Sequence, residues 1–398
     1  MSNAGVSKRG LALPASPIRK LIPFADQAKK RGIKVYHLNI GQPDIETPPQ
    51  FWNAVKAYSE KVLAYGSSQG MAGYLEKLTG YYRKLGLDVN PEDIIVTTGG
   101  SEAIIFAMTI ICDPGDEIII FEPFYTNYNG FAIQAGVNLV PITTRAETGF
   151  HFPDNSVIEK AITKKTKGIM YCNPNNPTGT VFSKEEITRL KDICLKHDLY
   201  LLADEVYREF IYEGEHVSIL TFDDIEDRAI MLDSISKRFS ACGARIGNLI
   251  VKNRDLYRAA LHLGQARLCA PTLDQMGAAA LYQLGEAYFK KTMQEYQRRR
   301  DVVFEALQKI KGVVCLKPEG AFYVMAKLPI DSAEKFAEFM MTDFNHQGKT
   351  VLVAPGPGFY ATPGLGQDEC RIAYVLNTGD LKDAMEILKL GIEAYNSR

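Results

Sequence analysis

The residue whose chemistry stands out in this sequence is a lysine that follows an apolar run. In LDSISKRFSACGARIG, residues 232–247, Ser234, Ser236 and Lys237 come directly after that run, and Arg245 follows among small residues. A lysine held away from water has its pKa lowered from about 10.4 and becomes a usable nucleophile, most often toward a carbonyl group. Hydroxyl groups and a guanidinium are suitable donors to a phosphate. The stretch therefore predicts a nucleophilic amine beside an anion site.

A second set of polar residues ends another apolar run, LLADEVYREF at 201–210. Asp204 lies at the end of the predicted strand, where a buried carboxylate is costly unless it meets a cation. The protonated ring nitrogen of pyridoxal phosphate is such a cation, and its charge makes the ring an electron sink. Tyr207 follows three residues later, where its phenol could reach the 3′-oxygen of that ring.

Two turn-forming motifs could complete such a site. NPNNPTG (173–179) follows a predicted strand and forms a rigid turn that presents the side-chain amide of Asn176. TTGGSEA (97–103) leads from a strand into a helix, whose free N–H groups favour a phosphate. This motif also nearly matches the nucleophile elbow G-x-S-x-G, so a hydrolase that uses Ser101 is a weaker alternative.

These motifs are placed by alternating strand and helix patterns. Helical patterns cover 101–112 and 183–197, and the second begins with a capping box from Ser183 to Glu186. Strand-like runs that are apolar on both faces occur at 93–98, 116–122, 167–172, 199–205, 229–235 and 247–252. The alternation predicts an α/β fold in three layers, with a mostly parallel sheet covered on both sides. Ligands of such sheets bind outside the carboxyl ends of the strands, where the polar motifs lie.

The pattern of apolar and polar residues changes near residue 285. A long polar helix at 286–310 leads into alternating segments at 320–328 and 369–377. We therefore predict a large domain at 46–285 that binds the cofactor, and a smaller α+β domain. The smaller domain is expected to combine residues 1–45 with residues 286–398. The first 45 residues are rich in proline, and we expect them to be irregular and to pack across it.

Composition argues against several classes of protein. The 398 residues are 46% apolar and 23% charged, and the net charge of −1 gives no electrostatic reason to bind nucleic acid or an anionic membrane. The longest apolar run, at 103–112, is too short to cross a membrane, and no secretory signal is visible. Seven scattered cysteines without metal-binding spacing predict reduced thiols in a cytoplasmic protein, and no metal site.

In order and spacing, these motifs resemble those of the class I/II aminotransferases, which are pyridoxal-phosphate enzymes of fold type I. The resemblance extends from SPIRKL (16–21) onward and rests on NIGQPD (39–44), YGSSQG (65–70), NPNNPTG, DEVY, SISKRFSACGARIG and CRIAYVLN (370–377). It implies transfer of an amino group from an L-amino acid to a 2-oxo acid, with 2-oxoglutarate expected, through a Schiff base with pyridoxal phosphate. It also implies a homodimer with active sites at the subunit interface.

The resemblance implies a role for each matching residue around the cofactor ring. Lys237 would be the Schiff-base lysine and the proton carrier between the substrate α-carbon and the cofactor. Asp204 would pair with the ring nitrogen, and Tyr207 and Asn176 would bond the 3′-oxygen. Tyr125, in EPFYTNY, would stack on the ring.

The resemblance also implies how the phosphate and the substrate are held. Tyr65 would reach the phosphate from the partner subunit. Arg371 would clamp the substrate α-carboxylate, with help from the Gly41 backbone and from Asn176. The remaining cofactor-binding residues would be Gly100, Ser101, Glu102, Ser234, Ser236 and Arg245.

The sequence leaves the substrate open. Many aspartate enzymes of this subgroup carry a lysine in GGKQAL, where this chain has Ser101 in GGSEAI. An aspartate-type activity is the leading expectation, and alanine or aromatic amino acids are alternatives. A carbon–sulfur lyase, a cyclopropane-carboxylate synthase or a cofactor-binding regulator could use the same lysine site. A dehydrogenase is a weak reading of GPGFYA (356–361), which fits G-x-G-x-x-A but is interrupted by Pro357.

Overall fold

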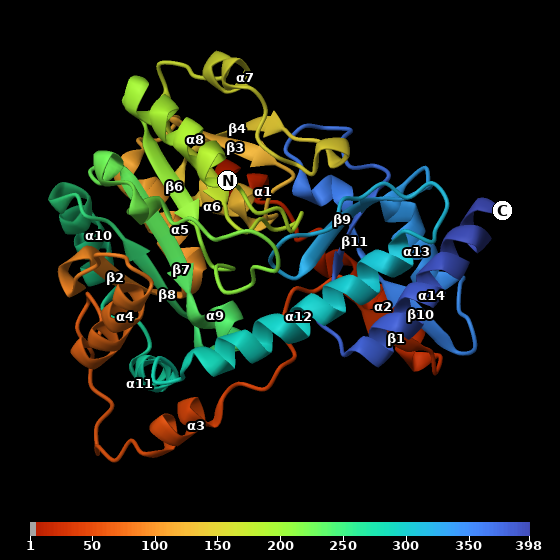
Figure 1. Cartoon of the computed structure of the whole chain (residues 1–398), viewed down its shortest axis with the longest axis horizontal. Coiled ribbons are helices and arrows are strands. Elements are labelled where there is room, and N and C mark those ends of the chain that lie inside the picture. Colours follow the sequence, from red (N-terminus) through yellow and green to blue (C-terminus); the bar gives the residue numbers. More distant parts are fainter. Residues whose placement is uncertain (1–4) are drawn as a thin grey trace.

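The centre of the fold is a seven-stranded sheet in the computed structural model, which describes residues 5–398 (Figure 1). Every neighbouring pair of strands is parallel except at β8, which runs antiparallel to both of its neighbours. In spatial order the strands are β2 (Ile94–Thr98), β8 (Ile246–Ile250), β7 (Ala229–Ser234), β6 (Tyr200–Asp204), β5 (Thr166–Cys172), β3 (Glu117–Glu122) and β4 (Asn138–Thr143). The predicted, mostly parallel sheet is confirmed.

Helices cover both faces of this sheet because its strands are apolar on both sides. Ile119 and Phe121 of β3 belong to one buried cluster, whereas Ile118 and Ile120 of the same strand belong to the other. The first cluster includes side chains of α4 (Ala72–Lys84), α8 (Lys184–Lys196) and α11 (Thr272–Leu281). The second includes side chains of α5 (Gly99–Ile111), α6 (Asn127–Ala135) and α10 (Arg254–Arg267). The period of two along each strand thus produces three layers.

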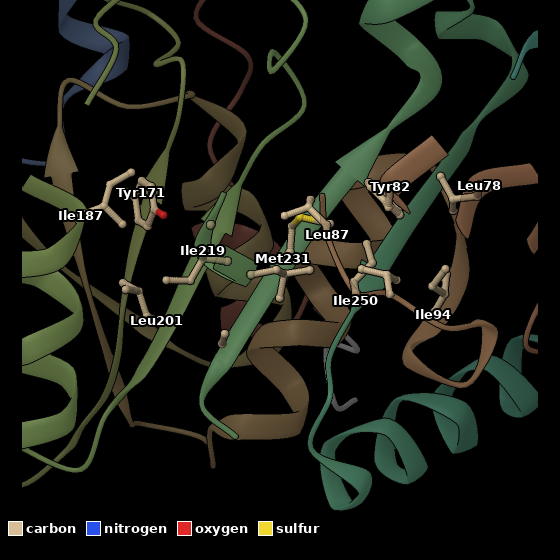
Figure 2. Packing of buried hydrophobic residues seen from close by; sticks show 14 of the residues in the cluster. Leu78, Tyr82, Leu87, Ile94, Tyr171, Ile187, Leu201, Ile219, Met231 and Ile250 are labelled. Atoms are coloured by element: carbon tan, nitrogen blue, oxygen red, sulfur yellow. The ribbon is translucent and has the colours of Figure 1, made fainter. Parts of the chain in front are cut away.

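Figure 2 shows the packing of the first cluster. Leu201 of β6, Met231 of β7 and Ile250 of β8 contribute to one continuous buried layer. Ile187 of α8 and Leu78 of α4 belong to the same cluster. This layer fixes the strands whose ends carry the polar motifs.

Another buried cluster combines side chains of the C-terminal part of the chain with N-terminal residues such as Leu21 and Tyr36. The long helix α12 (Glu286–Leu307) runs from the large sheet to a smaller group of C-terminal elements (Figure 1). They are an antiparallel sheet of β11 (Ala354–Pro355), β12 (Glu369–Ala373) and β9 (Tyr323–Lys327), together with β10 (Lys349–Leu352), α13 (Ala333–Thr342) and α14 (Thr378–Asn396). The domain boundaries given above stay a prediction.

The N-terminal region departs from the prediction of an irregular segment. It contains α1 (Lys8–Ala12), α2 (Ile22–Lys30) and β1 (Lys34–His37), and β1 pairs in parallel with β10. The prolines misled the prediction, because Pro23 stands in the first turn of α2, where proline starts a helix instead of breaking it. The partner strand of β1 lies near the other end of the chain, so local sequence gave no sign of the pairing.

Shorter elements complete the chain. The remaining α-helices are α3 (Pro49–Lys56), α7 (Asn155–Lys160) and α9 (Ile235–Arg238). Turns of 3₁₀-helix occur at Arg19–Leu21, Pro91–Asp93, Ala146–Thr148, Ile219–Thr221, Asp223–Ile225, Cys242–Ala244 and Gly356–Phe359. Within residues 5–398, no helix combines the length and the apolar character that crossing a membrane requires.

Candidate active site

A cavity of about 700 Å³ brings most of the predicted site residues together. It lies where β5, β6 and β7 end, as expected for a parallel sheet. The predicted residues that line it are Gly41, Gly100, Ser101, Tyr125, Asn176, Asp204, Tyr207, Ser234, Ser236, Lys237, Arg245 and Arg371. The fold brings this set together from both ends and the middle of the chain.

Lys237 lies on the short helix α9, directly after β7. Ser234 caps this helix, because its Oγ accepts a hydrogen bond from the Ser236 N–H at 3.1 Å. The Lys237 Nζ donates to the Gly41 carbonyl at 2.7 Å and lies 3.9 Å from the Cys242 Sγ. Burial lowers the pKa of Lys237, since water is excluded from the ammonium form. The structure thus makes the neutral, nucleophilic form of this amine easier to reach than in water.

Asp204 ends β6 as a buried carboxylate without a cationic partner. Its Oδ2 accepts a hydrogen bond from the Tyr128 phenol at 2.6 Å, and its Oδ1 accepts one from the Val206 N–H at 3.3 Å. Neither donor is charged, and no ion pair to Asp204 forms within residues 5–398. Burial raises the pKa of Asp204 to about 6. A cation at this place would stabilise the charged form.

Arg371, on β12, is a buried guanidinium without an anionic partner, whereas Asp204 is a buried carboxylate without a cationic one. The Arg371 Nη1 donates to the Asn176 Oδ1 at 3.0 Å, and its Nη2 donates to the Asn39 carbonyl at 2.7 Å. The buried Nε has no partner, and no carboxylate of residues 5–398 pairs with this guanidinium. The rings of Tyr323 and Phe359 lie 4.6 and 4.9 Å from it. Because a buried cation needs an anion, this group is suited to a ligand carboxylate.

A chain of hydrogen bonds connects Arg371 to the end of β6. Asn176 is the link, since its Oδ1 accepts from Arg371 while its Nδ2 donates to the Tyr207 phenol at 3.2 Å. The Tyr207 and Tyr323 phenol oxygens are 2.9 Å apart. Burial raises the pKa of Tyr207, so its phenol stays protonated and can serve as a donor.

The opposite part of the cavity combines a helix N-terminus with Arg245. Gly99, the first residue of α5, has φ +73°, and a Cβ there would lie 2.2 Å from the Arg245 Nη2. The Ser234 and Ser236 hydroxyls are 2.8 Å apart beside it in the cavity. A helix N-terminus, two hydroxyls and an arginine form a suitable cradle for a phosphate.

Two predicted residues do not line the cavity. The Glu102 carboxylate accepts from the Thr98 N–H at 2.7 Å and lies 3.5 Å from the Arg267 Nε. Its side chain therefore caps α5, and a cofactor contact would have to use its backbone N–H. Tyr65 is 80% exposed, so its predicted role requires a second subunit. Both roles stay predictions.

Sequence reasoning missed several residues that line the cavity. Tyr128 follows Tyr125 at the spacing of one helical turn, and this spacing could have indicated it. Tyr323 carried no chemical signal, because its strand alternates like an ordinary half-buried one. The N-terminal segment, which lines the cavity through Ser16, Ile18, Arg19 and Ile22, reaches it only through tertiary packing.

Two weaker readings of the sequence find no support in this geometry. GPGF forms a 3₁₀ turn after the two-residue strand β11, and residues 360–368 contain no helix, as a dinucleotide site would require. No histidine of residues 5–398 lines the cavity that contains Ser101. Ser101 therefore lacks the base that a hydrolase needs.

Similar folds and sequences are found among transaminases. The alanine aminotransferase from Pyrococcus furiosus superposes with a TM-score of 0.89 at 31% identity, covering 98% of this chain and 100% of that one. The putative aminotransferase YugH of Bacillus subtilis is 33% identical over 383 residues, which are 94% of this chain and 95% of that protein. The aspartate aminotransferase of Sulfurisphaera tokodaii is 32% identical over 367 residues, covering 91% and 90% of the two chains.

The fold is that of the fold type I transferases, as predicted. The family model for aminotransferase class I and II matches residues 33–388, and the chain belongs to this family. It is therefore an aminotransferase, an enzyme that exchanges amino groups between amino acids and oxo acids. The family depends on pyridoxal phosphate.

Proposed function

We propose that this chain is a pyridoxal-phosphate-dependent aminotransferase in which Lys237 is the reacting amine. The supporting observation is the set of unmatched charges in one cavity. Asp204 is a buried carboxylate without a cation, and Arg371 is a buried guanidinium without a carboxylate. A pyridinium nitrogen and a substrate carboxylate would supply the two missing partners.

The residues of the cavity fit this cofactor at each of its polar groups. When bound, pyridoxal phosphate supplies an aldehyde for attachment to a lysine and a ring that withdraws electrons from the reacting carbon. Asp204 would hold the ring nitrogen, while Tyr207 and Asn176 would donate to the 3′-oxygen. Tyr125 would cover the ring. Donors for the phosphate would be Gly100, Ser101, Ser234, Ser236, Arg245, the backbone of Glu102 and Tyr65 of the partner subunit.

The chain's own groups would orient the substrate and move its proton. Arg371, with Asn176 and the Gly41 backbone, would hold the α-carboxylate and so orient the Cα–H bond. The neutral Lys237 Nζ would accept the α-proton as a general base and return it as a general acid. The Gly41 carbonyl, at 2.7 Å, positions that amine. One nitrogen can serve both steps because burial lowers its pKa.

We also propose 2-oxoglutarate as the amino acceptor and an aspartate-type donor. The Sulfurisphaera relative is named for aspartate and the Pyrococcus structure for alanine, so both donors belong in the test. We further propose a cytoplasmic homodimer, in keeping with seven free cysteines and an exposed apolar surface at Trp52, Val62, Leu63 and Tyr65. The large domain is proposed at 46–285 and the small one at 1–45 and 286–398.

The role of Lys237 can be tested by covalent trapping and by turnover. Borohydride reduction of the cofactor-loaded protein, followed by mass spectrometry, should find the cofactor mass on Lys237. A panel of amino donors with 2-oxoglutarate should show turnover that Lys237→Ala reduces by at least about 10³-fold. Lys290→Ala, an exposed lysine on α12, is the control and should behave as wild type. An unmodified Lys237, or an active Lys237→Ala variant, would contradict the proposal.

A further inference from the structure

The cavity contains one basic side chain that the proposed function does not use. Arg19 lines it together with Ser16, Ile18 and Ile22, in the segment that leads into α2. The Arg19 backbone N–H donates to the Ser16 Oγ at 3.3 Å. Its guanidinium is exposed and forms no ion pair within residues 5–398. Its donors are therefore free for a ligand.

Packing places this segment on the side of the cavity where Arg371 lies. Ile18 packs against a buried cluster that includes Phe359. The Phe359 ring in turn lies 4.9 Å from the Arg371 guanidinium. A Cβ added to Gly358 would lie only 2.4 Å from the Pro17 Cβ, so the two segments are in direct contact. Residues 17–19 thus border the proposed carboxylate site.

The phosphate cradle does not need Arg19. Arg245 lies against Gly99 at the N-terminus of α5, where a Cβ on Gly99 would meet its Nη2 at 2.2 Å. Two hydroxyls, of Ser234 and Ser236, line the cavity as well. The phosphate charge therefore already has a cation and a helix N-terminus.

The basic side chains of the cavity could pair with one more anionic group than the phosphate and the α-carboxylate supply. Its basic side chains are Arg19, Lys237, Arg245 and Arg371, and its acidic side chain is Asp204. A phosphate would match Arg245 and an α-carboxylate would match Arg371. A second carboxylate on the substrate would match Arg19, whose planar fork suits a carboxylate.

We infer that Arg19 binds the side-chain carboxylate of a dicarboxylic substrate and so makes the enzyme select such substrates. The inference rests on the proposed function, because it assumes that Arg371 holds the α-carboxylate. Arg19 lies on a segment far in sequence from the rest of the cavity. Its contact with the second carboxylate would hold that segment against the substrate.

Steady-state kinetics of the cofactor-loaded enzyme test this selection. Arg19→Met keeps much of the apolar stem and removes the charge. It should lower kcat/KM for glutamate and aspartate by roughly tenfold or more, and should change that for alanine by less than about twofold. Lys20→Met is the matched control, because Lys20 is the next cation along the chain but pairs with Glu334 and does not line the cavity. It should alter neither class of substrate.

Binding of non-reacting acids gives a second readout that does not depend on turnover. By calorimetry, the loaded wild-type enzyme should bind succinate more tightly than propionate, and added salt should weaken this preference. Arg19→Met should abolish the preference, whereas Lys20→Met should keep it.

The outcomes separate this inference from the proposed function. An equal loss for glutamate and alanine would overturn it, because Arg19 would then act on every substrate. Unchanged kinetics, or an unchanged preference for succinate, would also overturn it. If wild-type enzyme transaminated no amino acid, the proposed function would fail instead, and the preference for succinate would still decide the role of Arg19.

Discussion

Asp204 shows how a single residue in the cavity depends on a ligand. Burial raises the pKa of its carboxyl from 3.8 to about 6. In the cofactor-free chain, the folded state favours the protonated carboxyl of Asp204. The stability that this preference gives is fully present below about pH 3.8 and is lost as pH rises through about 6. Above that range, the buried carboxylate lowers the free energy of unfolding, and a cation on the cofactor would reverse this effect.

Asp204→Asn should therefore stabilise the cofactor-free protein at neutral pH. The amide oxygen can still accept from Tyr128, and no charge is buried. We expect the free energy of unfolding to rise by about 2–3 kcal/mol near pH 8, by about half as much near pH 5, and to differ little below about pH 3.8. Urea unfolding at several pH values measures this difference. Cofactor affinity should fall in the same variant, and a less stable variant at pH 8 would contradict the explanation.

At the scale of elements, the approach of β8 to α5 shapes the phosphate cradle. A Cβ at Gly247 would lie 2.3 Å from the Gly99 carbonyl carbon and 2.4 Å from the Gly100 nitrogen. Both are backbone atoms, so Gly247→Ala must displace the first turn of α5. We expect a loss of about 1–3 kcal/mol in stability and a weaker affinity for the cofactor, measured by titration. Gly243→Ala, where no atom lies within 4 Å of the added Cβ, is the control. Equal affinities in the two variants would count against the cradle.

Helix α8 has a local stabilising device that the sequence predicted. Ser183 and Glu186 form a reciprocal capping box, with the Ser183 N–H donating to Glu186 at 2.9 Å. Ser183→Ala should lower the free energy of unfolding by about 1 kcal/mol, because one N–H loses its acceptor. Lys184→Ala, at the neighbouring exposed position, should change it by less than about 0.5 kcal/mol. Denaturant unfolding of both variants measures the difference, and similar values would mean that the cap contributes little.

At the scale of the whole molecule, four exposed apolar side chains support the proposed second subunit. Trp52, Val62, Leu63 and Tyr65 are 50%, 72%, 57% and 80% exposed. Large apolar side chains left exposed in one stretch of the sequence are usual at subunit contacts. In the proposed dimer, the same region brings Tyr65 to the partner's phosphate cradle.

Charges placed on this surface should therefore prevent association and reduce activity together. We expect the double variant Val62→Glu with Leu63→Glu to sediment as a monomer, whereas wild type should sediment as a dimer. Leu195→Glu, which alters an apolar residue 37% exposed on α8, should leave the dimer intact. A monomeric wild type with full activity would refute the shared site.

The sequence alone determined most strands of the large sheet and the polar residues at their ends. Apolar runs marked every strand of the large sheet except β4, and the spacing of Ser183 and Glu186 marked the start of α8. Parallel strands end at one edge, so Asp204 and Lys237 could be placed in one site without knowledge of the packing. These features are local, or follow from the topology, and therefore appear in residue type and spacing.

Only the tertiary structure decided which distant groups meet. Asn176 and Arg371 are 195 residues apart in sequence yet share a hydrogen bond, and Tyr323 joins them from a strand without any chemical signal. The pairing of β1 with β10 and the position of Arg19 at the cavity also escaped sequence reasoning. Contacts of this kind depend on how buried surfaces of remote segments fit together, and no local period or cap records that fit.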